Sequence, residues 1–250
     1  MMDTTRDAFL GGRITLEQPA KGYRAGVDPV LLASAVGARA GQSVLELGCG
    51  TGAALLCLAA RVPDLGLYGA EVQPHYADLC RKNALANGFN VVIDDADIRE
   101  LSHGIKDMSF DHVFANPPYF DRRTGHSSPL ADREVAFGGP TQSKDWLNTA
   151  YRRLKPKGWL TLIQKADRLP EILQAFDPRF GTISVTPIAG RSGRAADRFI
   201  LRARKGGQTP FVLTAPVVLH AGEKHVTDGE DYRPEIRDVL RNGAKFPFPG

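Results

Sequence analysis

Cysteine is scarce in this chain, and long apolar runs are absent. The 250 residues contain three cysteines, Cys49, Cys57 and Cys80, and none belongs to the Cys-x-x-Cys pairs that zinc and redox sites use. We therefore expect no metal site and a reducing, cytoplasmic setting. No run of eighteen apolar residues occurs, which excludes a membrane-spanning helix. The first twenty residues also lack the apolar stretch of a signal peptide.

A strong charge of one sign is missing as well. Lys and Arg number 32 against 28 Asp and Glu, so the formal net charge is +4. This modest surplus would suit a polyanionic partner without requiring one. Because 42% of the residues are hydrophobic and no tract has low complexity, the chain can bury one sizeable core.

An alternation of two patterns predicts the fold class. Short runs rich in Val, Ile, Leu and Phe alternate with longer helical patterns between residues 43 and 205, which is typical of an α/β protein with a parallel sheet and crossover helices. The predicted strands lie near 43-47, 66-71, 90-93, 110-115, 158-163, 182-187 and 198-204. Two later apolar runs, at 211-213 and 217-219, follow Pro210 and Pro216, which confine them to sheet edges or a hairpin.

These patterns predict a single domain over residues 1-250. It comprises an N-terminal extension (1-40), a core (41-205) and a C-terminal extension of strand and helix (206-250). In the first part, Val27-Asp28-Pro29 is typical of a helix start with Asp28 as the N-cap. The polar segment 120-140 shows no period and is expected to be a long loop.

A glycine-rich turn follows the first core strand. Val44-Leu45-Glu46-Leu47 runs into Gly48-Cys49-Gly50-Thr51-Gly52, and a helical pattern begins at Ala53. Glycines let the backbone turn sharply and let a ligand approach it closely. Dinucleotide enzymes share such turns, and so do turns that bind nothing, so this loop alone leaves the ligand open.

Acidic residues at the ends of the strands narrow the choice of ligand. Glu71 lies 21 residues beyond Gly50, where a carboxylate can accept hydrogen bonds from both ribose hydroxyls of an adenosine. A nicotinamide cofactor would need the same acid. Glu46, however, would repel a pyrophosphate and would favour the positively charged sulfonium of S-adenosylmethionine.

The third predicted strand ends in a cluster of acids. Asp97 could hold an adenine amino group, with Ile98 packing on the ring. Asp94 and Asp95 are rival candidates. A solvated acidic turn is an equally good interpretation of Asp94-Asp95-Ala96-Asp97 when its neighbours are ignored.

The fourth predicted strand runs directly into Asn116-Pro117-Pro118-Tyr119. Two prolines fix their backbone angles and remove two donors, so the turn is stiff and its carbonyls can point into a pocket. The Asn116 side-chain oxygen and the Pro117 carbonyl could accept both hydrogens of an exocyclic amine and hold its nitrogen in line with a methyl donor. Tyr119 and Phe120 could stack on a flat acceptor.

These motifs together resemble the class I S-adenosylmethionine-dependent methyltransferases with an Asn-Pro-Pro-Tyr motif. They are most similar to the bacterial tRNA adenine-N6 methyltransferases, through Gly22 to Asp28, Glu46 to Gly52, Ala96-Asp97-Ile98, Asn116 to Phe120 and Asp197 to Leu201. The resemblance implies a Rossmann-like, mostly parallel seven-stranded sheet with the last strand antiparallel, helices on both faces and a short N-terminal helical extension that closes over the cofactor.

The resemblance also implies a set of site residues, with S-adenosylmethionine as cofactor and tRNA as partner. The expected cofactor residues are Tyr23, Arg24, Asp28, Glu46, Gly48, Cys49, Gly50, Gly52, Glu71, Val72, Asp97, Ile98 and Asn116. The expected catalytic residues are Asn116, Pro117, Pro118 and Tyr119, and the expected substrate contacts are Tyr119, Phe120, Arg122, Arg123 and Arg198. A basic cluster (Arg191, Arg194, Arg198, Arg202, Arg204 and Lys205) could grip phosphates or could simply be solvated.

Three other functions stay open from the sequence. Enzymes that methylate a protein glutamine amide share Asn-Pro-Pro-Tyr, although they carry an extra helical region and only about forty residues precede the first strand here. A small-molecule or oxygen methyltransferase usually needs a base or a metal, and neither is visible near the fourth strand. The non-enzyme alternative is a cofactor-binding RNA chaperone or an inactive homologue that uses only its basic surface, and the intact Glu46, Glu71, Asp97 and Asn116 argue against such decay.

Overall fold

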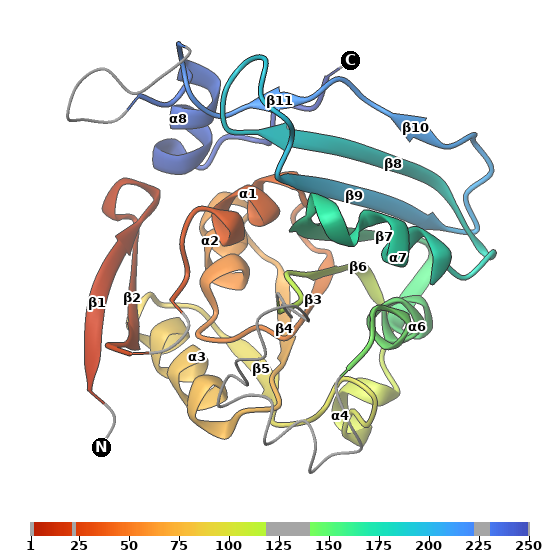
Figure 1. Ribbon diagram of the computed structural model, residues 1–250. Coiled ribbons are helices and arrows are strands. Elements are labelled where there is room, and N and C mark those ends of the chain that lie inside the picture. Colours follow the sequence, from red (N-terminus) through yellow and green to blue (C-terminus); the bar gives the residue numbers. More distant parts are fainter. Residues whose placement is uncertain (1–2, 22–23, 119–140, 223–230, 250) are drawn as a thin grey trace.

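The computed structural model of the chain describes residues 3–21, 24–118, 141–222 and 231–249. The described residues form a nine-stranded sheet with the order β10-β8-β9-β7-β6-β3-β4-β5, in which β11 also pairs with β8 (Figure 1). Its strands are β3 (Ser43–Leu47), β4 (Gly66–Ala70), β5 (Val91–Asp94), β6 (Phe110–Ala115), β7 (Leu154–Lys165), β8 (Phe180–Ala189), β9 (Arg198–Lys205), β10 (Val212–Leu213) and β11 (Val217–Val218).

The seven strands expected from the sequence are present, and β9 is antiparallel to both its neighbours, β7 and β8. All other neighbouring strands in the sheet are parallel. The carboxyl ends of β3 to β8 therefore meet at one edge, where sheets of this kind bind ligands. The short strands β10 and β11 pair separately with β8, so the runs after Pro210 and Pro216 form edge strands and not a hairpin.

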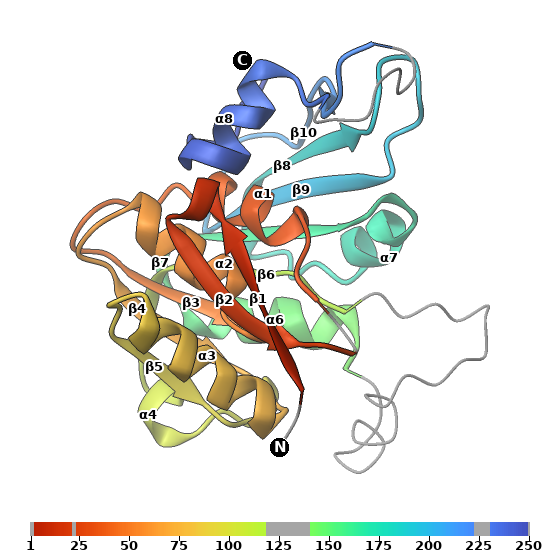
Figure 2. The same cartoon turned by 90° about the vertical axis from the view of Figure 1, so that its left-hand side faces the viewer.

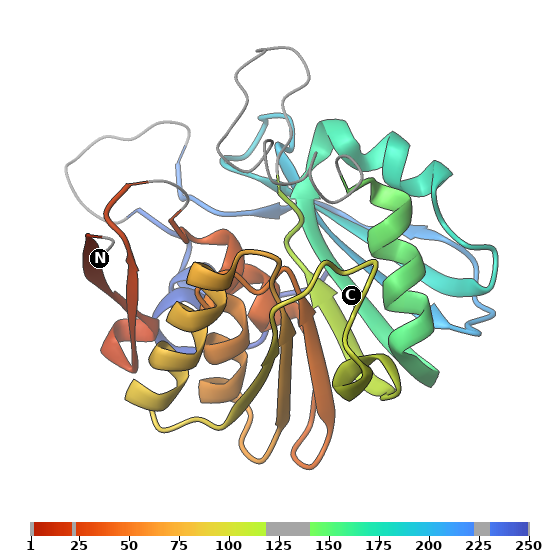
Figure 3. The ribbon, with the colours of Figure 1, turned by 90° about the horizontal axis from the view of Figure 1, so that it is seen from below.

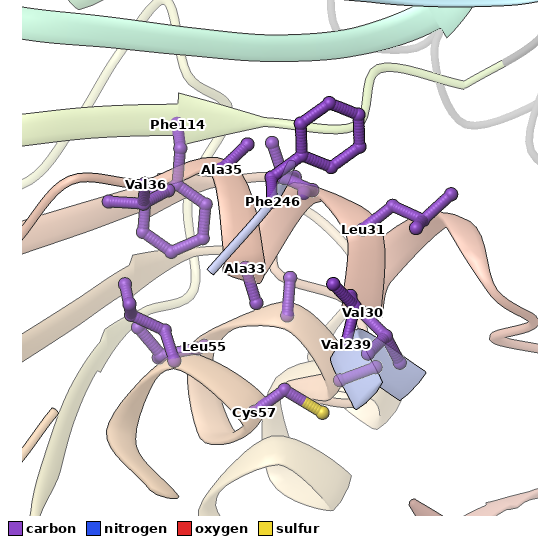
Figure 4. Packing of buried hydrophobic residues seen from close by; sticks show 14 of the residues in the cluster. Val30, Leu31, Ala33, Ala35, Val36, Leu55, Cys57, Phe114, Val239 and Phe246 are labelled. Carbon is purple, nitrogen blue, oxygen red and sulfur yellow. The ribbon is translucent and has the colours of Figure 1, made fainter. Parts of the chain in front are cut away.

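Helices cover both faces of the sheet (Figure 3). One face carries α1 (Asp28–Ala35), α2 (Ala53–Arg61), α3 (Pro74–Ala86) and α8 (Pro234–Asn242), and the other carries α4 (His103–Lys106), α6 (Ser143–Arg153) and α7 (Leu169–Gln174). Successive strand residues point to opposite faces. Val44 and Phe114 therefore pack with the first helices, whereas Leu45 and Val113 pack with the second. Figure 4 shows Phe114 beside Leu55 and Val36 in the first core.

The N-terminal extension contains more than the predicted helix. Strands β1 (Thr4–Phe9) and β2 (Ile14–Pro19), joined by a 3-10 turn (Leu10–Gly12), form a separate antiparallel hairpin that stands beside α3 (Figure 2). The helix α1 follows it, as expected. The prediction of Asp28 as the N-cap is wrong, because Val27 occupies that position and Asp28 is the first helical residue. Its carboxylate forms an ion pair with Arg198.

No helix in the described part of the chain is long and apolar enough to cross a membrane. The predicted long loop at 120–140 lies outside the described residues.

Two asparagines, one in α3 and one at its C-cap, attach the hairpin to the core. Asn83 is buried, accepts a hydrogen bond from the Glu17 backbone N–H (2.7 Å) and donates to the carbonyls of Glu17 (3.0 Å) and Thr51 (2.9 Å). One turn later, Asn87 bonds in the same way to the N–H and carbonyl of Thr15. The side chains of a helix thus substitute for a neighbouring strand, and Asn83 also reaches the glycine-rich turn.

Replacing Asn83 by alanine should lower the free energy of unfolding by about 1–3 kcal/mol, because the buried carbonyl of Thr51 and the partly buried N–H of Glu17 lose their partner. Urea unfolding followed by circular dichroism would measure this loss. Asn87→Ala is the matched control and should cost less, since its bonds to Thr15 are exposed to solvent. Equal costs for the two variants would contradict the role given to burial.

Candidate functional site

The glycine-rich turn lies at the carboxyl edge between β3 and α2. Gly48 and Gly50 adopt φ angles of +64° and +54°, which side-chain-bearing residues rarely adopt. A Cβ atom on Gly48 would lie 2.7 Å from the Trp146 ring of α6, so the glycine is required by close packing. A Cβ atom on Gly50 would have no atom within 4 Å among the described residues. The backbone is therefore open to a ligand at Gly50.

The remaining residues of the turn are fixed from both sides. Cys49 is buried and its N–H donates to the Ala70 carbonyl of β4 (3.0 Å), while its own carbonyl accepts from the Gly52 N–H (2.8 Å). Gly52 has a φ of +88°, and a Cβ atom there would lie 2.7 Å from the Cys80 sulfur of α3. The turn is thus held in one shape before any ligand binds.

Glu46 is a buried acid beneath the turn. Its Oε2 accepts a hydrogen bond from the Leu55 N–H in the first turn of α2 (2.9 Å). Burial raises the pKa of Glu46 well above its ordinary value, and the bond from Leu55 offsets only part of this rise. A buried carboxylate of this kind is stabilised by a cation nearby, which fits a sulfonium group.

Glu71 follows β4 and is also buried. Its Oε2 accepts from the Gly50 N–H and its Oε1 from the Gln73 N–H, both at 2.9 Å. Burial raises the pKa of Glu71, although these backbone bonds act in the opposite direction. Each carboxylate oxygen can accept a further bond, as the role expected for Glu71 with two ribose hydroxyls requires, and that role stays a prediction. Val72 follows Glu71 and is partly exposed.

The acidic cluster after β5 is divided by its partners. Asp95 forms an ion pair with Arg81, and Asp94 accepts from the Ser102 N–H at the start of α4 (2.8 Å). Asp97 is paired with Arg99 (2.6 Å). Although burial raises the pKa of Asp97, the hydrogen bonds from Arg99 outweigh this effect and leave it below the ordinary value. The three acids are thus distinguished by their partners, two arginines and one backbone N–H, which the sequence pattern did not assign.

Ile98 is buried in the core formed with α4 and α6. Its carbonyl accepts a hydrogen bond from the Thr149 hydroxyl of α6 (3.0 Å). The isoleucine therefore links the acidic turn to the helix that carries Trp146, and the role expected for it against an adenine ring stays a prediction.

The end of β6 brings the proline turn beside the glycine turn. In the parallel pair of β3 and β6, Leu47 is the partner of Ala115. Gly48 and Asn116 are therefore the next residues on neighbouring strands. The Asn116 Oδ1 atom is buried. The Pro117 carbonyl accepts a hydrogen bond from the Gln164 side chain of β7 (3.0 Å).

A pocket opens beside this turn, on the side of α6 and α7. Its volume is about 370 Å³, open solvent included, and its walls combine flat apolar groups with a few polar ones. The lining residues are Pro117, Pro118, Thr141, Ser143, Trp146, Leu147, Leu162, Gln164, Arg168 and Ile172. Trp146 thus lies against the glycine-rich turn at Gly48 and also lines the pocket.

The N-terminal residues expected at the cofactor site form ion pairs with other parts of the protein. Arg24 forms an exposed ion pair with Asp7 of β1 (2.7 Å). Asp28 and Arg198 form an ion pair (2.9 Å) that joins α1 to β9 across 170 positions of the sequence. Arg198 also pairs with Asp197 (2.9 Å). Its expected contact with a substrate phosphate would have to form beside these acids and stays a prediction.

The basic residues near β9 do not form one cluster. Arg191, Arg194 and Arg198 lie at the carboxyl edge, whereas Arg204 and Lys205 lie at the other end of the antiparallel strand. Arg202 lies over the rings of Trp159 and Phe248, and the Lys205 amine donates to the carbonyls of Tyr151 and Leu154. The prediction of a single basic cluster is therefore wrong.

Five residues named from the sequence lie outside the described residues: Tyr23, Tyr119, Phe120, Arg122 and Arg123. Among the residues the structure does describe, no group of three or more His, Cys, Asp and Glu could hold a metal ion. Sequence reasoning missed Arg99, Trp146 and Gln164. Only Gln164 could have been found from the sequence, because it is a polar residue at the end of the apolar run that forms β7.

Comparison with known proteins places this site in a family. A family model described as a methyltransferase domain matches residues 44–126. The tRNA1(Val) (adenine(37)-N6)-methyltransferase of Porphyromonas gingivalis is 33% identical over 175 residues, which cover 66% of this chain and 68% of that relative. The release factor glutamine methyltransferase of Aliivibrio fischeri is 35% identical over 100 residues, covering 38% and 32%.

Among solved structures, a predicted O-methyltransferase from Agrobacterium tumefaciens has a TM-score of 0.68 and 27% identity, covering 87% of this chain and 97% of that one. The fold is that of a class I S-adenosylmethionine-dependent methyltransferase. Within this class, the chain belongs to the family of the bacterial tRNA1(Val) (adenine(37)-N6)-methyltransferases. S-Adenosylmethionine, its cofactor, supplies an electrophilic methyl group.

Affinity for S-adenosylmethionine should fall as the pH is lowered through the raised pKa of Glu71. In the role expected for Glu71, only the carboxylate could accept from both ribose hydroxyls, and burial means that this form is lost at a higher pH than for an ordinary glutamate. Binding should then release protons, which calorimetry in buffers of different ionisation enthalpy would detect.

Glu71→Gln should weaken cofactor binding by about 10- to 100-fold, or about 1.5–3 kcal/mol, and should reduce the proton release. Asp95→Asn removes a charge from the same edge of the sheet and should leave the affinity nearly unchanged, because its partner is Arg81. An unchanged affinity in Glu71→Gln would show that this acid is misassigned.

Proposed function

We propose that the protein transfers a methyl group from S-adenosylmethionine to the exocyclic N6 of an adenine in tRNA. The observation that carries this proposal is the register of β3 and β6, which sets the Asn116 turn beside the Gly48 turn. An acceptor at the first turn would meet a methyl group held by the second. Binding of the acceptor is thus assigned to the end of β6 and binding of the methyl donor to the end of β3, which are neighbouring strands of one sheet.

The chemistry of the turn supports an amino nitrogen as the acceptor. The lone pair of an adenine N6 is delocalised into the ring, and it becomes available when acceptors bind both amino hydrogens. The Asn116 Oδ1 and the Pro117 carbonyl are the acceptors we assign. No general base is required, because the amine loses its proton readily once it is methylated.

The surroundings of the turn support a nucleobase in RNA. The pocket beside Pro117 and Pro118 offers Trp146 and aliphatic side chains as walls, with Gln164 and Arg168 as polar groups. Basic residues at the same edge, Lys165 at the end of β7 and the exposed Arg194 between β8 and β9, suit a phosphate backbone. The relative in Porphyromonas gingivalis is named for such a reaction on a tRNA.

Methylation of a protein glutamine amide is the second candidate. An amide nitrogen also presents two hydrogens to the turn, and the match to a release factor glutamine methyltransferase covers 100 residues. We favour tRNA because the similarity to the tRNA-modifying relative covers 66% of the chain against 38%. Methyl label recovered in a release factor and absent from tRNA would reverse this choice.

The direct test uses tRNA transcribed in vitro, which carries no modification, together with methyl-labelled S-adenosylmethionine. Mass spectrometry of the digested nucleosides should show N6-methyladenosine in the tRNA. Free adenosine and a purified release factor serve as parallel acceptors. Label confined to either of them, or absent from all three, would overturn the proposal.

Asn116→Ala should reduce kcat by about 100- to 1,000-fold while leaving the dissociation constant for the cofactor within about threefold. The reason is that its assigned partner is the target amine. Single-turnover methylation and calorimetry would measure the two quantities. Asn148→Ala on α6 is a matched control, and it should change neither quantity. Equal loss of turnover and cofactor affinity would contradict the role of Asn116.

A further inference from the structure

The pairing of β6 with β7 stops where the proline turn begins. Its last pair is Ala115 with Leu162, whereas β7 continues along β9 through Gln164 and Lys165. Pro117 and Pro118 have no N–H group, so they cannot extend the ladder as donors. The backbone pairing that fixes β6 is therefore absent at the residues to which we assign the chemistry.

Gln164 supplies the missing connection with its side chain. The side chain is buried, with 3% of the residue exposed, and its Nε2 donates to the Pro117 carbonyl at 3.0 Å. Its Oε1 accepts from the Lys165 N–H at 2.8 Å. Both ends of the amide thus have a partner, and only one orientation places the NH₂ group against the carbonyl.

A carbonyl oxygen has two lone pairs, and Gln164 uses one of them. The second can accept a hydrogen from the target amine. We infer that Gln164 is a positioning residue for methyl transfer, which holds the Pro117 carbonyl at the angle required by the acceptor nitrogen. This inference rests on the proposed function, in which the Pro117 carbonyl binds the amine.

The side chain at position 164 must carry a hydrogen-bond donor that reaches the Pro117 carbonyl. Methionine has a similar volume but no donor, so it would fill the space and release the carbonyl. An ionised glutamate would place a negative oxygen against the carbonyl oxygen and push it away. A protonated glutamate, by contrast, can donate its O–H to Pro117 and restore the contact.

Gln164→Met should lower kcat for tRNA methylation by about 10- to 100-fold, the cost of misplacing a reacting group by about 1 Å. The KM for tRNA and the dissociation constant for S-adenosylmethionine should change little, because neither depends on the angle of one carbonyl. Thr161→Val is the matched control on the same strand. It removes a buried hydroxyl that has no hydrogen-bond partner among the described residues and should leave kcat unchanged.

Gln164→Glu provides a readout that a purely structural role would not move. Its kcat, relative to the wild type at each pH, should rise as the pH is lowered, since protonation restores a donor to the Pro117 carbonyl. This variant also retains the shape of the side chain, so it reports on the hydrogen bond even where Gln164→Met fails to fold.

Three results would overturn the inference. A normal kcat in Gln164→Met shows that the hydrogen bond does not matter, and a Gln164→Glu activity that keeps a constant ratio to the wild type at all pH values shows that the donor does not matter. A wild-type enzyme that forms no N6-methyladenosine defeats the proposed function and this inference together. An active wild type with either of the first two results defeats this inference alone.

Discussion

The parallel pairing of β3 with β6 is the constraint on which the rest of the site depends. Because Leu47 is paired with Ala115, the glycine turn and the proline turn begin side by side at one edge of the sheet. Neither turn can move along its strand without breaking the hydrogen-bond ladder and both cores. The sheet therefore sets the distance between the two turns, and loops and helices only adjust the groups around them.

The buried acids near this edge cost stability and are held by backbone donors. Glu46 is bonded to the start of α2, and Glu71 is bonded to Gly50 and to the start of α3. Their raised pKa values show that these bonds do not fully compensate for burial. In the roles expected for these acids, a positively charged cofactor would favour their ionised form, so the burial that costs stability would favour binding. This is how a site can be selective for a sulfonium over a phosphate-bearing cofactor.

Long-range side-chain contacts join the N-terminal extension to the core. Asn83 bonds to Glu17 of the hairpin and to Thr51 of the glycine turn, and Asp28 of α1 pairs with Arg198 of β9. A displacement of the extension would therefore shift the glycine turn as well, because α3 is bonded to both. The extension is thus linked to the carboxyl edge of the sheet, while its closure over a bound cofactor stays a prediction.

The sequence by itself determined the strands from β3 to β9, the glycine turn and the position of Asn116 at a strand end, because each depends on a local pattern of apolar residues, glycine and proline. The hairpin of β1 and β2 escaped prediction, since β1 has no buried residue and β2, although largely buried, carries only Ile14 and Leu16 as apolar side chains besides its terminal proline. Tertiary structure alone decided which acids meet cations, that the basic residues of β9 separate to two ends, and that Gln164 bonds to Pro117 across 47 positions. Such partners are chosen by strand order and side-chain packing, and a local pattern carries no information about either.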